Sequence, residues 1–360
     1  MNGHTHPGNA AFVIVMCCVT SLNAADAEVG LGEPVIRYET AAPQSIQSPP
    51  EKRAVDVNNW SRSAVAAWYD DEYVATLSVP MQWSGSAATC TAGTTSQAYI
   101  DATFQMINYY RGMVGLPEVN NNASLNSDCQ EAALMFAVNN ALSHSPPSGW
   151  TCYTSGGATA AGSSNIALGA AGPGAMSLYM KDPGINNYFV GHRRWLLCPT
   201  KGGFGTGSVD SPRTANSLWV FGNAVSRPAT PDVVAWPPEG YVPYQVVYDR
   251  WSLSLNSSPY ANYGSATVTM TENGSPISLS VVSRANNGYC DNTIVWEPSG
   301  LSFTPGAADR TITVTVSNIG GSPSSVTYDV VVIDPSLYPE EVFADGFEAG
   351  GAGDWDEIAD

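Results

Sequence analysis

Residues 191–195 read Gly-His-Arg-Arg-Trp and contain one of the chain's four histidines. Two others, His4 and His6, precede an apolar stretch that is typical of a removable N-terminal signal. The fourth is His144, so an imidazole base or a histidine metal site in the mature chain must use His144, His192 or both. These two positions are therefore the first candidates for chemistry.

The N-terminus carries a short apolar run at residues 10–22, followed by small residues. This pattern predicts a signal peptide over residues 1–25, with cleavage near Ala25 or Ala27. No other stretch reaches the ~20 apolar residues of a spanning helix, so no transmembrane segment is expected. We expect a secreted, extracellular protein that passes through the periplasm in transit.

Acidic residues dominate the charge of the chain. Its 360 residues include 32 acids and 14 bases, for a formal net charge of -18. An acidic surface repels phosphate, and no basic cluster is longer than Arg193-Arg194, so no nucleic-acid partner is expected. Residues 336–360 hold eight acids and no base, which is typical of a solvated acidic tail.

Five cysteines remain if Cys17 and Cys18 leave with the signal. In an oxidising compartment they are expected to form disulfides, and the odd number leaves one unpaired or paired between chains. The sequence does not determine the pairing of these residues, which are Cys90, Cys129, Cys152, Cys198 and Cys290.

The first half of the chain mixes helical and strand patterns. Residues 26–60 lack periodicity and are interpreted as a linker or lead-in. Helical spacing runs from Gln97 to Gly115, and a capping box at 127–130 predicts a second helix that ends at His144. The remaining expectations are a glycine-rich loop at 153–158, a short helix near 175–180, and strands at 194–197 and 217–221. Together they predict a layered helix-and-sheet domain over residues 61–225.

The second half, residues 226–335, shows only strand and turn patterns. Alternating apolar residues lead into Asn273-Gly274, which predicts a hairpin, and further alternation follows at 312–316 and 328–332. These patterns predict a β-sandwich of immunoglobulin type.

The local surroundings of the two histidines predict opposite pKa shifts. Backbone carbonyls at a helix end favour a protonated ring, which predicts a raised pKa for His144. Two adjacent cations predict a lowered pKa for His192. Taken alone, each histidine is more often a packed or solvated residue than a ligand.

Four segments, taken in their order along the chain, strengthen the case that the two histidines belong to a functional site. They are residues 107–116, Leu142-Ser143-His144, residues 161–167 (Ala-Gly-Ser-Ser-Asn-Ile-Ala) and Gly191-His192-Arg193-Arg194-Trp195. Together they resemble the CAP superfamily of cysteine-rich secretory, antigen and pathogenesis-related proteins, and are most similar to its bacterial secreted members. The resemblance implies an α+β fold: an α-β-α sandwich followed by an all-β, immunoglobulin-like sandwich.

The family cleft holds two histidines and two acids, and the resemblance assigns the histidines to His144 and His192. Ser164 stands where the first acid of the family motif would be, beside Asn165. Asp182 is the nearest candidate for the second acid. The alternative is that Asp182 is only a turn residue. The expected ligand cleft therefore consists of His144, Ser164, Asn165 and His192.

A firm cofactor is not expected. Two imidazoles can hold a divalent ion such as Zn²⁺ only weakly, since a zinc site needs three or four protein ligands and supporting carboxylates. His144 and His192 are the candidate ligands. A nucleophile is also poorly supported: Cys152 could form a thiolate–imidazole pair with His144, but a disulfide is the favoured role.

Three functions remain open. The favoured one is a secreted, non-catalytic module whose histidine cleft binds a small ligand, an ion or a partner protein surface. The second is a hydrolase or peptidase that uses His144 or His192 as base, with Asp182 as helper. The third is glycan or cell-wall binding through aromatic side chains of the sandwich, for which core packing is the plainer explanation: Trp236, Tyr241, Trp251 and Trp296.

Overall fold

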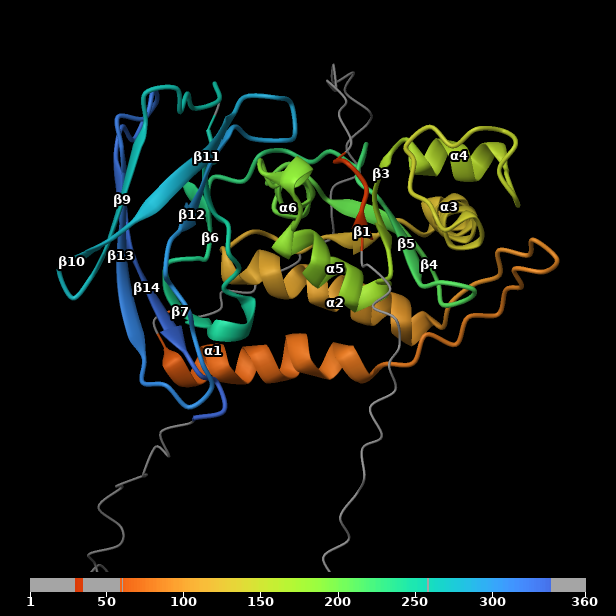
Figure 1. Cartoon of the computed structure of the whole chain (residues 1–360), viewed down its shortest axis with the longest axis horizontal. Coiled ribbons are helices and arrows are strands. Elements are labelled where there is room, and N and C mark those ends of the chain that lie inside the picture. Colours follow the sequence, from red (N-terminus) through yellow and green to blue (C-terminus); the bar gives the residue numbers. More distant parts are fainter. Residues whose placement is uncertain (1–29, 35–58, 60, 258, 338–360) are drawn as a thin grey trace, which may run out of the picture.

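The computed structural model describes residues 30–34, 59, 61–257 and 259–337. The predicted signal peptide, most of the lead-in and nearly all of the acidic tail lie outside the described residues. Figure 1 shows a helix-and-sheet half beside a half built from strands, as the α+β prediction requires. Within the described residues, no helix is long and apolar enough to cross a membrane.

The first half contains the longer helices and one mixed sheet. The α-helices are α1 Arg62–Trp68, α2 Gln97–Met113, α3 Asn126–Asn139, α4 Ser155–Ala161, α5 Gly172–Lys181 and α6 Gly191–Leu196. The strands are β1 Gly30–Leu31, β2 Asn120–Asn121, β3 Ser164–Leu168, β4 Gly203–Val209 and β5 Ala215–Trp219. Short π or 3-10 turns lie at Tyr69–Tyr73, Val74–Ser78, Ala123–Leu125, Ile185–Asn187 and Tyr244–Val246.

The sheet has the strand order β1-β3-β5-β4-β2 and is covered on both faces (Figure 1). Alternate residues of β3 pack on opposite sides, because side chains along a strand alternate. Ile166 and Leu168 join the apolar cluster of α3 and α4, whereas Ala167 joins that of α2, α5 and α6. The α-β-α layering is therefore confirmed.

The helix α3 starts and ends differently from the prediction. It begins at Asn126, and Gln130 does not close a capping box, because its side-chain amide bonds the backbone of Ser208 on β4. The helix ends at Asn139, where Asn140 adopts a left-handed conformation with φ of 46°. His144 therefore lies in the following loop and not at the helix terminus.

Two further local predictions were wrong. The glycine-rich stretch forms helix α4, capped by the Thr154 hydroxyl. Its Gly157 serves close packing, since a Cβ there would lie 2.8 Å from Met135 Cε of α3. Residues 194–197, predicted as a strand, belong mainly to α6. Every residue of this six-residue helix is buried, so its sequence shows no alternation between a buried and an exposed face that would identify it as helical.

The lead-in prediction for residues 26–60 also needs correction at its start. Gly30 and Leu31 form β1, which pairs with Leu168 and Ala167 of β3 at the edge of the sheet. This segment was missed because two residues carry no periodic pattern.

The second half forms two antiparallel-rich sheets that face one another, consistent with a β-sandwich (Figure 1). One has the order β10-β9-β13-β14-β7 and the other β11-β12-β8-β6. The strands are β6 Val233–Trp236, β7 Gly240–Pro243, β8 Trp251–Leu255, β9 Thr267–Glu272, β10 Ser275–Ile277, β11 Leu279–Ala285, β12 Thr293–Pro298, β13 Arg310–Ser317 and β14 Val326–Ile333. The hairpin at Asn273-Gly274 is confirmed. That the sandwich is of immunoglobulin type stays a prediction.

The large aromatic residues of this half are mostly core residues. Trp236, Trp251 and Trp296 are at most 1% exposed, and Tyr241 is partly buried against the same cluster. The three tryptophans therefore cannot present their rings to a glycan, and their predicted alternative role in the core is the observed one.

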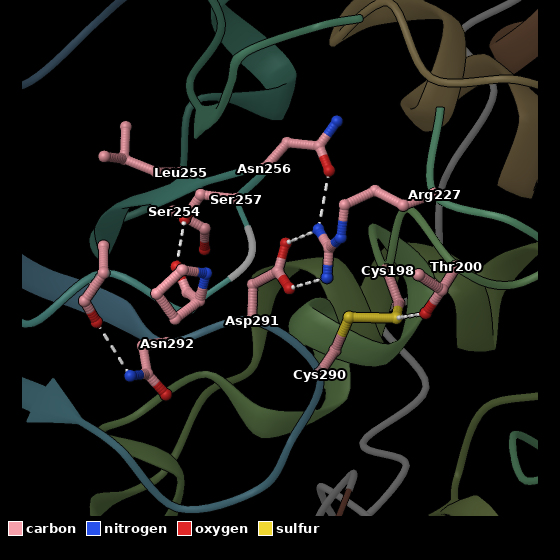
Figure 2. Close-up of polar contacts among 12 residues, drawn as sticks. Cys198, Thr200, Arg227, Ser254, Leu255, Asn256, Ser257, Cys290, Asp291 and Asn292 are labelled. Carbon is pink, nitrogen blue, oxygen red and sulfur yellow. Dashed lines mark hydrogen bonds and ion pairs between the residues drawn. A yellow bond between two sulfur atoms is a disulfide. The ribbon is translucent and has the colours of Figure 1, made fainter. Parts of the chain in front are cut away.

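A disulfide joins the two halves beside α6, next to an ion pair within the second half. Cys198, which follows α6, is bonded to Cys290 of the loop before β12. Figure 2 shows the Arg227 guanidinium beside this disulfide, where it donates to both carboxylate oxygens of Asp291 at 2.6 and 2.8 Å. A second disulfide joins Cys90 to Cys152, which excludes a Cys152 thiolate, and Cys129 is buried and unpaired.

We predict that removing the Cys198–Cys290 bond destabilises the fold. The bond closes a loop with a sequence separation of 92 residues, so its loss frees the unfolded chain. The double variant Cys198→Ser, Cys290→Ser should lose about 2–4 kcal/mol of unfolding free energy, measured by urea denaturation. Cys129→Ala, which breaks no disulfide, is the control. A double variant with the wild-type midpoint and slope would contradict this prediction.

Candidate functional site

His192 lies in the first turn of α6 and is fully buried. The turn begins after Val190, which is held at φ of 49°, an unusual conformation for a β-branched residue. The imidazole stacks on the ring of Tyr179 from α5, with centroids 5.4 Å apart and planes 11° from parallel. The Tyr179 hydroxyl donates to Asn216 Oδ1 of β5 at 2.9 Å, which fixes the stacking partner to the sheet.

Asp182 anchors His192 from the end of α5. The residue is the left-handed C-cap of that helix, and its carboxylate is also fully buried. Oδ1 lies 2.8 Å from His192 Nδ1, and Oδ2 accepts the backbone N–H of His192 at 2.9 Å. Because the carboxylate accepts here, the neutral ring carries its proton on Nδ1 and presents Nε2 as an acceptor.

Two buried polar atoms at the site have no hydrogen-bond partner among the described residues. One is His192 Nε2 and the other is Asn165 Oδ1 on β3. The Asn165 amide donates to the His192 backbone oxygen at 3.2 Å, so both atoms belong to the same neighbourhood. An unpartnered buried acceptor costs about 1–3 kcal/mol, so a donor from water or a ligand would stabilise this arrangement.

His144 approaches from the loop after α3. Its Nδ1 lies 2.6 Å from the Ala161 oxygen, and its Nε2 contacts the backbone oxygen of Glu33. Burial lowers the pKa of His144, which outweighs the raising effect of the two carbonyls, and the nearby His192 lowers the pKa further. The predicted rise in the pKa of His144 was therefore wrong. His144 lies beyond the end of α3, and the segment that contains Glu33 covers it.

The structure brings four of the five sequence-predicted site residues together. His144 and His192 influence each other electrostatically, Asp182 holds His192, and Asn165 bonds its backbone. Ser164 lies on the other face of β3, beside the Cys129 thiol. The adjacent cations turn away: Arg193 bonds Arg250 and Ser252 of the sandwich, and Arg194 bonds Asn287 and Asp291.

Two participants were missed by the sequence analysis. Tyr179 lies three residues before Asp182 on α5, a spacing that places both on one helical face and could have indicated it. Glu33 contributes only a backbone oxygen, which no sequence pattern signals.

The residues do not fit a tightly bound zinc ion. Both nitrogens of His144 face carbonyl oxygens, and Asp182 takes Nδ1 of His192, which leaves one imidazole nitrogen for a metal. A zinc site needs three or four protein ligands. In the part of the chain that the structure describes, no group of three His, Cys, Asp or Glu side chains is placed to hold a metal.

A separate cavity of about 480 Å³ lies between the end of α2 and the sandwich. Its lining includes Met113, Val233, Glu239 and Tyr328, and none of the sequence-predicted site residues. This cavity therefore does not coincide with the histidines.

Comparison with known proteins adds a family match. The model of the cysteine-rich secretory protein family (CAP) matches residues 104–223, which include His144, Asn165, Asp182 and His192. A search of curated proteins finds none that matches the chain.

We predict that Asp182→Ala is strongly destabilising. The substitution leaves the buried His192 Nδ1–H and two backbone N–H groups without their acceptor. The unfolding free energy should fall by about 3–5 kcal/mol in chemical denaturation, whereas Asp210→Ala at an exposed position should change it by about 0.5 kcal/mol or less. Equal losses in the two variants would show that the pair is not structurally important.

We also predict an acid-sensitive contribution from His144. Its folded-state pKa lies below the unfolded value of about 6.5, so the unfolded chain binds the proton more readily. This contribution to stability is fully present above pH ~6.5 and is lost as the pH falls through the folded pKa. Between pH 7 and 5 the wild type should therefore lose more unfolding free energy than His144→Gln. Parallel stability curves for the two proteins would contradict this assignment.

Proposed function

The chain belongs to the cysteine-rich secretory protein (CAP) family through residues 104–223, and on this premise we propose that it is a secreted, non-catalytic binding module. The binding site is the cleft of His144, Asn165, Asp182 and His192. The observation that carries the proposal is His192 Nε2, a buried ring nitrogen that has no partner in the described part of the chain and is held in place by Asp182 and Tyr179.

Secretion is supported by the N-terminal signal pattern and by the disulfides. Two disulfides among the described residues are typical of a protein that folds in an oxidising compartment. The acidic composition agrees with a partner that is neither nucleic acid nor another strongly acidic surface.

The geometry favours binding over hydrolysis. A histidine base needs a hydroxyl, thiol or water within hydrogen-bond reach. Asp182 and His192 form an acid–imidazole pair of the kind that hydrolases use, which keeps the hydrolase alternative testable. However, Cys152, the nucleophile considered from the sequence, is in a disulfide, and the Ser164 hydroxyl lies on the opposite face of β3 from Asn165.

A paired assay of binding and turnover tests the proposal. A panel of zinc ions, cell-wall glycan fragments, extended peptides and small esters is titrated against the wild type and the double variant His144→Gln, His192→Gln. We expect at least one class to bind the wild type about tenfold or more tightly than the double variant, without turnover of any panel member. Surface variant Asp210→Ala should bind like the wild type.

Two results would overturn the proposal. Unchanged binding of every class by the double variant would place the site elsewhere. Hydrolysis of an ester or peptide by the wild type but not by the double variant would identify a hydrolase instead.

A further inference from the structure

Residues 30–34 form an extended strap along β3 that contacts His144 and packs beside His192. We use the word strap for these five residues, Gly-Leu-Gly-Glu-Pro, which precede α1 in the sequence. Gly30 and Leu31 pair antiparallel with β3, and the Gly32 N–H donates to the Ile166 oxygen at 3.1 Å. The strap therefore adds a strand to the edge of the sheet, which is how many proteins bind a peptide in extended form.

The strap continues past His144 toward Tyr289 with two backbone contacts. The Glu33 oxygen contacts His144 Nε2, and the Pro34 oxygen accepts the Tyr289 hydroxyl at 3.2 Å. Pro34 is buried and packs against Gly191, the residue next to His192. The groove beneath the strap is therefore formed by β3, the His144 loop, the start of α6 and Tyr289 of the sandwich.

Side-chain selectivity in this groove is confined to a few positions. A Cβ on Gly32 would overlap the side chain of Ile166, which is fully buried in the α3 cluster and would have to shift. A Cβ on Gly191 would overlap the Pro34 ring, so the missing side chain at 191 makes room for proline. Leu31 packs against the main core, whereas the Glu33 side chain is exposed.

These contacts define a pattern that the groove accepts. Glycine is favoured at the position over Ile166, an exposed side chain is accommodated next, and proline follows against Gly191. We propose that the groove is a binding site for an extended polypeptide segment of the pattern Leu-Gly-x-Pro from a partner protein, and that the chain's own residues 31–34 occupy it as a competing ligand.

The inference rests on the proposed binding role of the cleft and names the class of its partner. While the strap is in place, Glu33 occupies the His144 Nε2 that a bound segment would contact. A strap tethered to the groove acts at an effective concentration in the millimolar range, so a peptide of similar affinity competes poorly until the strap is displaced.

Matched glycine variants of the full chain test the proposal. Gly32→Val places a side chain against Ile166 and should expel the strap. Gly30→Val is the control, because a Cβ at Gly30 meets nothing within 4 Å. The probe is a fluorescein-labelled peptide with the sequence of residues 28–35, Glu-Val-Gly-Leu-Gly-Glu-Pro-Val, and binding is followed by fluorescence anisotropy.

The expected result is a selective gain of peptide binding. The Gly32→Val chain should bind the probe at least about tenfold more tightly than the wild type and the Gly30→Val chain. A probe that itself carries Gly32→Val should lose at least about tenfold in affinity for the opened chain, whereas one carrying Gly30→Val should keep it. Pro34→Ser, which removes the ring packed on Gly191, provides a second opened chain with an independent cause.

Equal affinity of all chains for the probe, or no binding by the Gly32→Val and Pro34→Ser chains, would overturn the proposal. Equal binding of the two valine-substituted probes would also overturn it, because the pattern would then carry no selectivity. If the probe fails to bind while the double histidine variant still weakens binding in the panel described above, this inference falls and the proposed function stands. If the panel shows no dependence on the histidines, the proposed function falls whatever the probe does.

Discussion

The buried pair of Asp182 and His192 is the interaction on which the site depends. Neither side chain is exposed, so both have lost their hydration, and direct hydrogen bonds must replace it. The carboxylate accepts from the imidazole and from backbone N–H groups at the start of α6. One side chain thus joins the end of α5 to the beginning of α6 and sets the orientation of the ring.

The start of α6, which Asp182 holds in place, is also bonded to the β-sandwich. The start of α6 also carries Arg193, whose guanidinium reaches Met180 on one side and β8 of the sandwich on the other. Burial lowers the pKa of Arg193 to about 10, yet the group still donates to fixed carbonyl oxygens. Tyr289 from the sandwich then contacts the strap over the cleft. The sandwich therefore helps to build the site as well as to enlarge the protein.

Local patterns predicted the parts of the fold that depend on local chemistry. Helix α2 and the hairpin at Asn273-Gly274 were correct because their periodicity and turn residues are contained in a short window. The end of α3 and the helical conformation of α6 were predicted incorrectly. Asn140 ends α3 early, and α6 is buried on every side, so its sequence has no exposed face to indicate a helix. His144 and His192 were found because few histidines exist, whereas the Glu33 contact depends on a chain segment 111 residues from His144. Sequence patterns do not report such long-range backbone contacts.

The state of the His192 ring tests this account most directly. Long-range ¹H–¹⁵N NMR of the full chain at pH 8 distinguishes the two neutral tautomers of an imidazole. Our account predicts one fixed tautomer, with the proton on Nδ1 toward Asp182 and an unprotonated Nε2. A ring with its proton on Nε2, or one averaging rapidly between both tautomers, would contradict the claim that Asp182 holds His192 as an acceptor in the cleft.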